Sequence, residues 1–195
     1  VTWIKGEEGS TVSIEVYRPS EDKYLTFEVE RKTIEIPMVT SKMLDNNIGY
    51  VAVYEFEETT SEQFNQAIDE LTAQGMKGLI IDLRDNPGCL VNSATAILDR
   101  ILSKDQLLVY TVDKNGKKQE EYTEDDETIN VPISVLINGN SASASEIVSG
   151  CLQDYGKAKL VGTTSFGKGI VQYVLPLGDG SAIKLTSAKY YTPNG

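Results

Sequence analysis

The first 34 residues alternate between apolar and polar positions in two short runs. Residues 11–18 and 25–30 both alternate in this way, and the segment 19–22 between them is rich in turn-forming residues. Strict alternation predicts β-strands, and two such runs around a short turn predict an antiparallel hairpin. Any small antiparallel β-module would show the same pattern.

The remainder of the chain alternates apolar strands with helical patterns. Apolar strands are predicted at 49–56, 78–83 and 131–137, and an Asn115-Gly116 turn predicts a hairpin before the third. Helical spacing follows each strand, with apolar faces formed by Phe64, Ala67, Ile68 and Leu71, then by Ala94, Ile97, Leu98, Ile101 and Leu102, and finally by Ile147, Val148, Cys151, Leu152 and Tyr155. The chain is therefore expected to form stacked β-α units of an α/β fold.

Charge and composition exclude several classes of function. The 195 residues contain 18 Lys and Arg against 29 Asp and Glu, and the net charge of -11 argues against a nucleic-acid partner. There is no histidine and the two cysteines lack metal-ligand spacing, so neither a metal nor another cofactor is expected. The acidic run 120–127 is interpreted as a solvated surface segment. No apolar stretch approaches the roughly 18 residues that span a bilayer.

A serine stands at the corner between the 131–137 strand and the helix that follows it. Ser143 has Glu146 three residues later, which is the pattern of a capping box, so Ser143 is the predicted N-cap. Free backbone N–H groups at such a corner, together with the helix dipole, also suit the stabilisation of an oxyanion. The residues alone leave both interpretations open, a helix cap and a catalytic nucleophile.

Lys168 lies between two glycines 25 residues further on. A serine nucleophile needs a general base, and without histidine the remaining nitrogen base is lysine. A lysine amine must lose its proton to act as a base, which burial away from carboxylates favours. Phe166, Ile170 and Val171 are candidates for an apolar wall, and no acidic residue occurs between Lys157 and Leu177. The alternative is a solvated Gly-Lys-Gly turn.

The segment 162–169 also resembles a phosphate-binding loop, with a glycine, four residues and then Gly-Lys. Two features oppose nucleotide binding. Gly169 occupies the position of the magnesium-binding Ser or Thr, and the β-branched residues after it predict a strand where a phosphate loop requires a helix.

Three segments together resemble the carboxy-terminal processing peptidases, also called tail-specific proteases. They are 78–88 (GLIIDLRDNPG), 137–154 (INGNSASASEIVSGCLQD) and 162–172 (GTTSFGKGIVQ). The resemblance implies a core related to the crotonase and Clp-protease architecture. It places a remnant of a PDZ domain at residues 1–34 and a serine protease core at residues 35–195, truncated at its C-terminal end.

The same resemblance implies roles for individual residues. Ser143 would be the nucleophile, Lys168 the general base and Gln172 the residue that orients the lysine. Backbone N–H groups of Ala144 and of the turn 86–89 would form the oxyanion hole.

Cys89 departs from the family pattern, which has a second glycine at this position. A positive φ angle would strain a cysteine here, and either Gly88 or Cys89 could supply the N–H donor. Its side chain could be a packed small residue, a thiol near the nucleophile or half of a disulfide with Cys151.

The predicted function is a serine endopeptidase that processes or degrades proteins from accessible C-terminal tails. The resemblance further implies an extracytoplasmic location and a full-length protein with a membrane anchor as one possibility, with the targeting segment outside this chain. The alternatives are a catalytically inactive PDZ-type scaffold and the nucleotide-binding protein already discussed.

Overall fold

The computed structural model describes residues 3–34, 36–126 and 128–195 and divides into two units, Val1–Ile36 and Pro37–Gly195. Residue 35, where the predicted protease core begins, and residue 127, at the end of the predicted acidic run, lie outside the described residues.

The first unit is the predicted hairpin. β1 (Thr11–Arg18) pairs antiparallel with β2 (Lys23–Glu30), and the turn between them places Asp22 in the left-handed region with a φ of 50°. Arg31 ties the preceding segment to the hairpin, because its guanidinium donates to the carbonyl of Ile4 (2.7 Å) and to Ser10 Oγ (2.8 Å). The identification of this unit with a PDZ domain stays a prediction.

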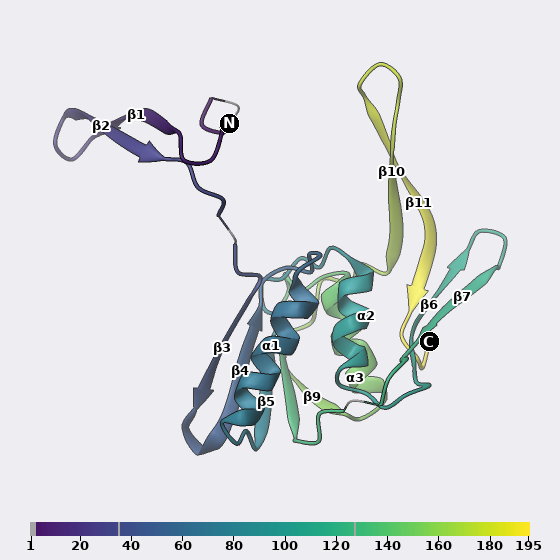
Figure 1. Cartoon of the computed structure of the whole chain (residues 1–195). Coiled ribbons are helices and arrows are strands. Elements are labelled where there is room, and N and C mark those ends of the chain that lie inside the picture. The colour runs from purple at the N-terminus through teal and green to yellow at the C-terminus, as the bar shows by residue number, and fades with distance from the viewer. Residues whose placement is uncertain (1–2, 35, 127) are drawn as a thin grey trace. The chain divides into compact units, whose positions relative to one another are not determined.

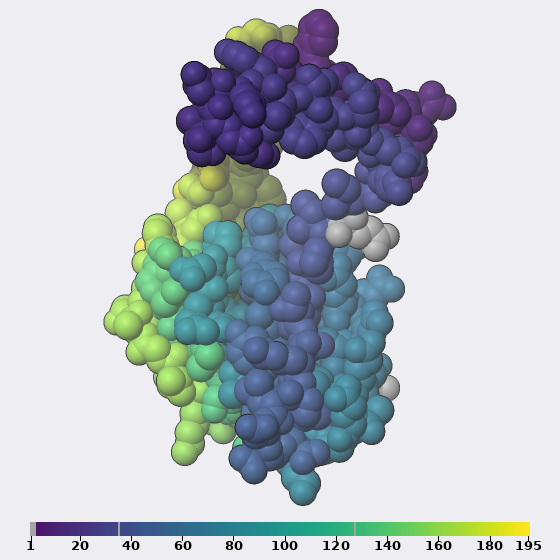
Figure 2. All heavy atoms as spheres, turned by 90° about the vertical axis from the view of Figure 1, so that its left-hand side faces the viewer, coloured from purple at the N-terminus to yellow at the C-terminus, as the bar shows by residue number. Residues whose placement is uncertain are grey.

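The second unit is built on a five-stranded sheet in the order β3-β4-β5-β8-β9. Its strands are β3 (Val39–Leu44), β4 (Ile48–Val53), β5 (Gly78–Asp82), β8 (Ile133–Ile137) and β9 (Ala158–Gly162). β3 pairs antiparallel, and the other neighbours pair parallel. The short 3-10 helix η1 (Asp45–Asn47) joins β3 to β4. β3 was not among the strands predicted from the sequence. It forms an edge of the sheet with exposed polar side chains and lies on the side shown in Figure 2.

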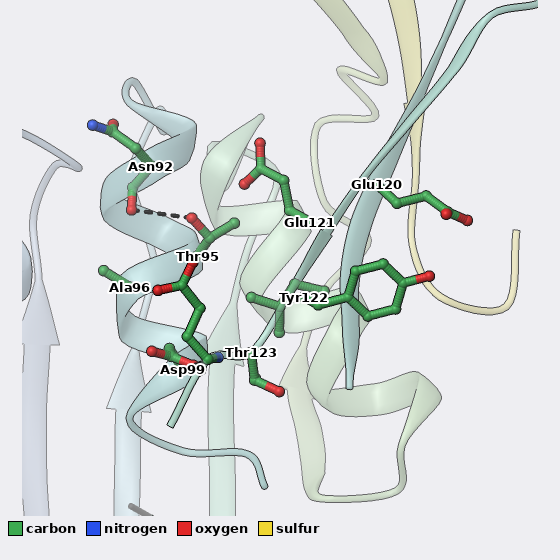
Figure 3. Close-up of a pocket in the computed structure, with 10 residues that line it drawn as sticks. Asn92, Thr95, Ala96, Asp99, Glu120, Glu121, Tyr122 and Thr123 are labelled. Carbon is green, nitrogen blue, oxygen red and sulfur yellow. Dashed lines mark hydrogen bonds between the residues drawn. The ribbon is translucent and has the colours of Figure 1, made fainter. Parts of the chain in front are cut away.

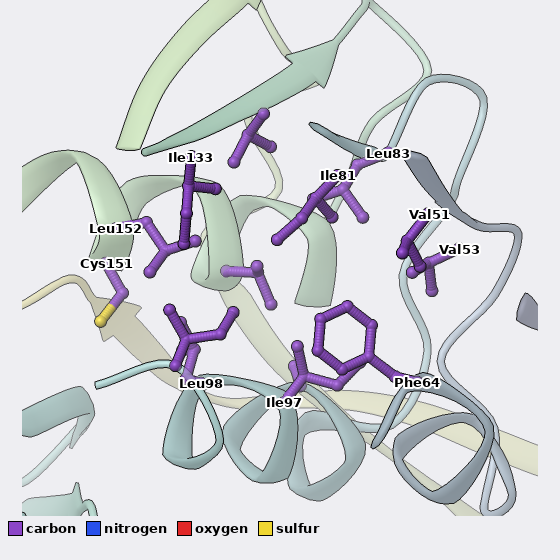
Figure 4. Close-up of a cluster of buried hydrophobic side chains, with 14 of the residues drawn as sticks. Val51, Val53, Phe64, Ile81, Leu83, Ile97, Leu98, Ile133, Cys151 and Leu152 are labelled. Carbon is purple, nitrogen blue, oxygen red and sulfur yellow. The ribbon is translucent and has the colours of Figure 1, made fainter. Parts of the chain in front are cut away.

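Three helices connect the parallel strands: α1 (Thr60–Ala73), α2 (Val91–Asp99) and α3 (Ala144–Asp154). The apolar residues predicted for α1 are all buried, and the N-cap of α1 is Thr59. α2 ends before Ile101 and Leu102, yet both side chains remain buried in the core. Figure 4 shows this core, in which Phe64, Ile97 and Leu98 gather with residues from the strands. Each fully buried side chain of this kind contributes about 1.5–3 kcal/mol.

A second, antiparallel sheet has the order β10-β11-β6-β7. Its strands are β6 (Leu107–Asp113), β7 (Lys118–Tyr122), β10 (Ile170–Pro176) and β11 (Ala182–Tyr191), and both hairpins extend away from the helices in Figure 1. The predicted Asn115-Gly116 turn joins β6 to β7, with a φ of 80° at Gly116. The mixed α/β fold is thereby confirmed at the level of fold class.

Candidate active site

Ser143 stands at the N-terminus of α3, where the chain leaves β8 and turns into the helix. It is the N-cap, as predicted, and its backbone holds a φ of 57° and a ψ of -113°. A non-glycine residue in such a sparsely populated conformation costs about 1–3 kcal/mol and is typical of functional corners. The residue is 9% exposed, so the corner is largely enclosed.

The two neighbouring serines make structural hydrogen bonds. Ser141 Oγ donates to the carbonyl of Leu83 (2.6 Å), and Ser145 Oγ donates to the carbonyl of Asn86 (3.0 Å). Both side chains are completely buried. By contrast, the hydroxyl of Ser143 lies beside the hydroxyl of Tyr190, a residue on β11 that the sequence analysis did not single out.

The turn 86–89 packs directly against this corner. Asn86 is fully buried, its amide donates to the carbonyl of Val53 (2.8 Å), and its carbonyl accepts the N–H of Ala142 (3.1 Å). A Cβ atom on Gly88 would lie only 2.5 Å from the carbonyl oxygen of Ala142 and 2.8 Å from the nitrogen of Ala144. Only glycine therefore fits at position 88 without moving the serine corner.

Two N–H groups at this contact are available to a ligand. The N–H of Gly88 already donates to Asn86 Oδ1 (2.8 Å). Among the described residues, the N–H groups of Ala144 and Cys89 have no hydrogen-bond partner. In this turn, the N–H of Gly88 is therefore occupied and the N–H of Cys89 is free.

Cys89 adopts the conformation that the sequence analysis considered strained, with a φ of 111°. Cys89 is exposed, yet partial loss of hydration raises the pKa of its thiol, the carboxylates of Glu57 and Glu55 raise it further, and the positive charge of Lys168 opposes them. Both cysteines are free, so the bridge to Cys151 is not formed. Burial raises the pKa of Cys151 to about 12, which keeps this core thiol protonated.

Lys168 lies in the loop between β9 and β10 and is half-buried. Its carbonyl accepts a hydrogen bond from the hydroxyl of Tyr190. Within the described part of the chain, its amine makes no ion pair. The predicted apolar wall is incomplete, because Phe166 is 67% exposed, whereas Tyr190 is partly buried next to the loop.

Gln172 does not donate to Lys168 in this structure. Its side-chain amide donates to Thr186 Oγ1 on β11 (3.2 Å), and a bulge interrupts the pairing between Val171 and Gln172. The segment that resembled a phosphate loop continues into β10 and not into a helix, as the sequence predicted. It therefore lacks the helix N-terminus that binds phosphate.

Glu146 joins the serine corner to the lysine loop. Its carboxylate accepts the N–H of Ser143 (2.9 Å), the hydroxyl of Ser165 (2.7 Å) and the N–H groups of Gly167 (2.6 Å) and Lys168 (2.8 Å). Burial raises the pKa of this carboxyl, but the four hydrogen bonds outweigh burial and lower it from its ordinary value of 4.5. The sequence indicated Glu146 only as part of a capping box.

A cavity of about 590 Å³ adjoins the turn and the second sheet. Cys89, Ile147, Gln172 and Tyr190 line it together with apolar residues of α2, β6 and β10. A second cavity of about 550 Å³ lies between α2 and β7 and is lined by acidic and polar residues (Figure 3). None of the predicted catalytic residues lines the second cavity. Gln172 lines the first, which makes it the candidate substrate site, and Lys168 lines a smaller cavity of about 220 Å³ that shares Tyr190 with the first.

Metal-ligating side chains come together at one place in the described residues. Glu55, Glu57 and Cys89 present ligand atoms within 4.8 Å of one another. The raised pKa of the thiol disfavours the thiolate that binds metals.

The helices of the described residues are all too short or too polar to span a membrane.

Comparison with known proteins gives consistent matches. The model of Peptidase family S41 matches residues 47–195. The chain is 41% identical over 197 residues to carboxy-terminal processing protease CtpB of Bacillus subtilis, covering 98% of this chain and 41% of that protein. It is 37% identical to CtpA of the same organism, covering 100% of this chain and 42% of that protein.

Among solved structures, the photosystem II D1 C-terminal processing protease matches with a TM-score of 0.72 and 30% identity, covering 97% of this chain and 53% of that one. The chain thus spans less than half the length of these two Bacillus relatives.

Proposed function

Because the chain belongs to peptidase family S41, we propose that it carries the catalytic centre of a serine endopeptidase that processes proteins at their C-terminal ends. One observation carries the proposal. The strained corner of Ser143 packs against a turn in which the N–H of Cys89 has no partner, and the carboxylate of Glu146 in the same helix end accepts the N–H of Lys168.

In the proposed reaction, Ser143 Oγ attacks the carbonyl carbon of the scissile peptide bond. Its proton passes to the neutral amine of Lys168, which later gives it to the leaving amine. The N–H groups of Ala144 and Cys89 stabilise the oxyanion of the tetrahedral intermediate. Water then hydrolyses the acyl-enzyme ester, again with Lys168 as the base.

Substrate binding is proposed for the cavity beside the turn. Its lining by Val91, Val109, Ile147 and Val171 suits an apolar side chain of an unfolded protein segment. Gln172 lines the same cavity, and its amide could reach Lys168 only after leaving Thr186. We therefore retain Gln172 as a proposed orienting residue in the substrate-bound state.

The proposal also covers the identity of the two units, the cellular location and the preference for substrate tails. The first unit is proposed to be the end of a PDZ domain that senses substrate tails, and the second a crotonase-like core. An extracytoplasmic location and a membrane anchor on the full-length protein are proposed by resemblance alone. Cleavage of one unfolded protein with and without a blocked C-terminal carboxylate tests the tail preference, and equal rates would contradict it.

The catalytic proposal is tested by peptide cleavage and by labelling with a fluorophosphonate. Ser143→Ala and Lys168→Arg are both expected to lower kcat by at least about 10⁴-fold, because alanine removes the nucleophile and guanidinium cannot act as a base. Ser61→Ala, in the first turn of α1, is the matched control and should retain the full rate. Labelling of the unsubstituted chain that persists in Ser143→Ala would reject the nucleophile, and an absence of both labelling and cleavage favours the inactive scaffold.

A further inference from the structure

Glu146 makes more hydrogen bonds than a helix cap requires. In a capping box the glutamate returns only to the N–H of its own N-cap residue, here Ser143. The remaining three bonds go to the loop between β9 and β10, at Ser165, Gly167 and Lys168. The carboxylate therefore connects two segments that lie 19 to 22 residues apart in the sequence.

Each carboxylate oxygen of Glu146 accepts two of the four hydrogen bonds. Oε2 accepts the N–H groups of Ser143 and Lys168, so a single oxygen bridges the backbones of the proposed nucleophile and the proposed base. Oε1 accepts the hydroxyl of Ser165 and the N–H of Gly167. Hydrogen bonds to an ionised carboxylate are shorter and stronger than neutral ones. Glu146 therefore holds the loop of Lys168 firmly against the backbone of Ser143.

We propose that Glu146 is a positioning residue that holds the loop of the general base against the backbone of the nucleophile. The inference rests on the proposed function, because it assigns the purpose of the connection to catalysis by Ser143 and Lys168. Glu146 acts through these two residues, and its carboxylate is occupied by their N–H groups and those of the loop.

An amide cannot replace this carboxylate. All four partners are donors, and a glutamine offers one acceptor oxygen and one NH₂ group that is itself a donor. In one orientation it loses the bridge between Ser143 and Lys168, and in the other it loses Ser165 and Gly167. Glu146→Gln should therefore loosen the loop although it keeps the size and shape of the side chain.

The test compares Glu146→Gln with Glu62→Gln in the same chain. Glu62 is the acidic residue in the first turn of α1 and occupies the same third helical position, but it is exposed. We expect Glu146→Gln to lower kcat on the order of 100-fold, the effect of a displacement of about 1 Å, with KM within about twofold. Glu62→Gln should leave both constants unchanged.

Amide hydrogen exchange provides a readout that does not depend on catalysis. The N–H groups of Gly167 and Lys168 should exchange at least about tenfold faster in Glu146→Gln than in the unsubstituted chain, because they lose their acceptor. Ser165→Ala removes only one donor and leaves the carboxylate in place, so it should give a smaller loss of kcat. If Glu146→Gln does not fold, Ser165→Ala still tests the inference.

An unchanged kcat in Glu146→Gln, or unchanged exchange at Gly167 and Lys168, would overturn the inference. So would a Ser165→Ala variant with normal kcat and normal exchange at Gly167 if the glutamine variant cannot be obtained. If the unsubstituted chain neither cleaves peptides nor reacts with fluorophosphonate, the proposed function has failed. The exchange rates then decide separately whether Glu146 fastens the loop.

Discussion

Three residues at the candidate site hold backbone conformations in the left-handed region, with φ angles of 97° at Gly88, 111° at Cys89 and 57° at Ser143. Glycine adopts such angles without cost, whereas each of the other two stores about 1–3 kcal/mol. The strain at Cys89 is maintained by the pairing of its neighbours with Phe56, which donates to the carbonyl of Gly88 (2.9 Å) and accepts the N–H of Leu90 (2.8 Å).

Gly88→Ala tests the contact between the turn and the serine corner. The added methyl group would overlap backbone atoms of Ala142 and Ala144 at 2.5 Å and 2.8 Å. We expect a loss of about 3 kcal/mol in the free energy of unfolding, from overlap and φ strain together, and cleavage at background level. Urea denaturation and a peptide assay measure the two effects.

Gly116→Ala is the matched control for this substitution. Gly116 has a similar φ of 80° and nothing within 4 Å of an added Cβ, so only the conformational cost of about 1–2 kcal/mol should appear. Its peptide cleavage should be normal. Equal losses of stability in the two variants would show that the close approach at Gly88 has no energetic importance.

At the scale of elements, several partly buried polar groups lie close together at the start of α3. The same helix end holds the N-cap Ser143, the carboxylate of Glu146 and the buried hydroxyl of Ser145 bonded to Asn86. Through these contacts α3 is connected to the turn after β5 and to the loop before β10. The site is therefore assembled around a single helix end.

The lowered pKa of Glu146 predicts how stability depends on pH. A carboxyl whose pKa is depressed in the folded state contributes its full stability above its ordinary value of 4.5 and loses it as the pH falls through the lowered value. Urea denaturation between pH 7 and pH 3 should show the difference between the unsubstituted chain and Glu146→Gln shrinking towards acid pH. A constant difference for Glu146→Gln would contradict the assignment of these hydrogen bonds.

At the scale of the whole molecule, the two units differ in how much they can bury. The second unit encloses a core of apolar side chains between helices and a five-stranded sheet (Figure 4). The first unit is a two-stranded hairpin with exposed apolar residues that include Tyr24 and Phe27. A two-stranded hairpin alone is marginally stable in water.

Hydrogen exchange should therefore separate the two units. Amides of β1 and β2 are expected to exchange at least about 100-fold faster than those of β5 and β8, which open only with the core. Exchange of the intact chain followed by NMR or mass spectrometry measures this difference. Equal protection in both regions would show that the hairpin has further stabilising contacts.

The sequence by itself determined the elements that depend on local patterns. The helical spacing of Phe64, Ile68 and Leu71 predicted the buried face of α1, because periodicity of side chains dictates which face avoids water. Ser143 and Glu146 predicted the start of α3, since a capping box lies within four consecutive residues. The residues proposed for catalysis were named from motifs and resemblance.

The tertiary structure alone decided how these segments meet. Two of the contacts at the site join segments that are far apart in the sequence: Tyr190 lies beside Ser143, and Gln172 pairs with Thr186. Such contacts depend on the register of β10 and β11 and on the packing of two loops, which no local periodicity encodes. The second role of Glu146 belongs with them, because a carboxylate fits a capping pattern equally well whether or not a distant loop donates to it.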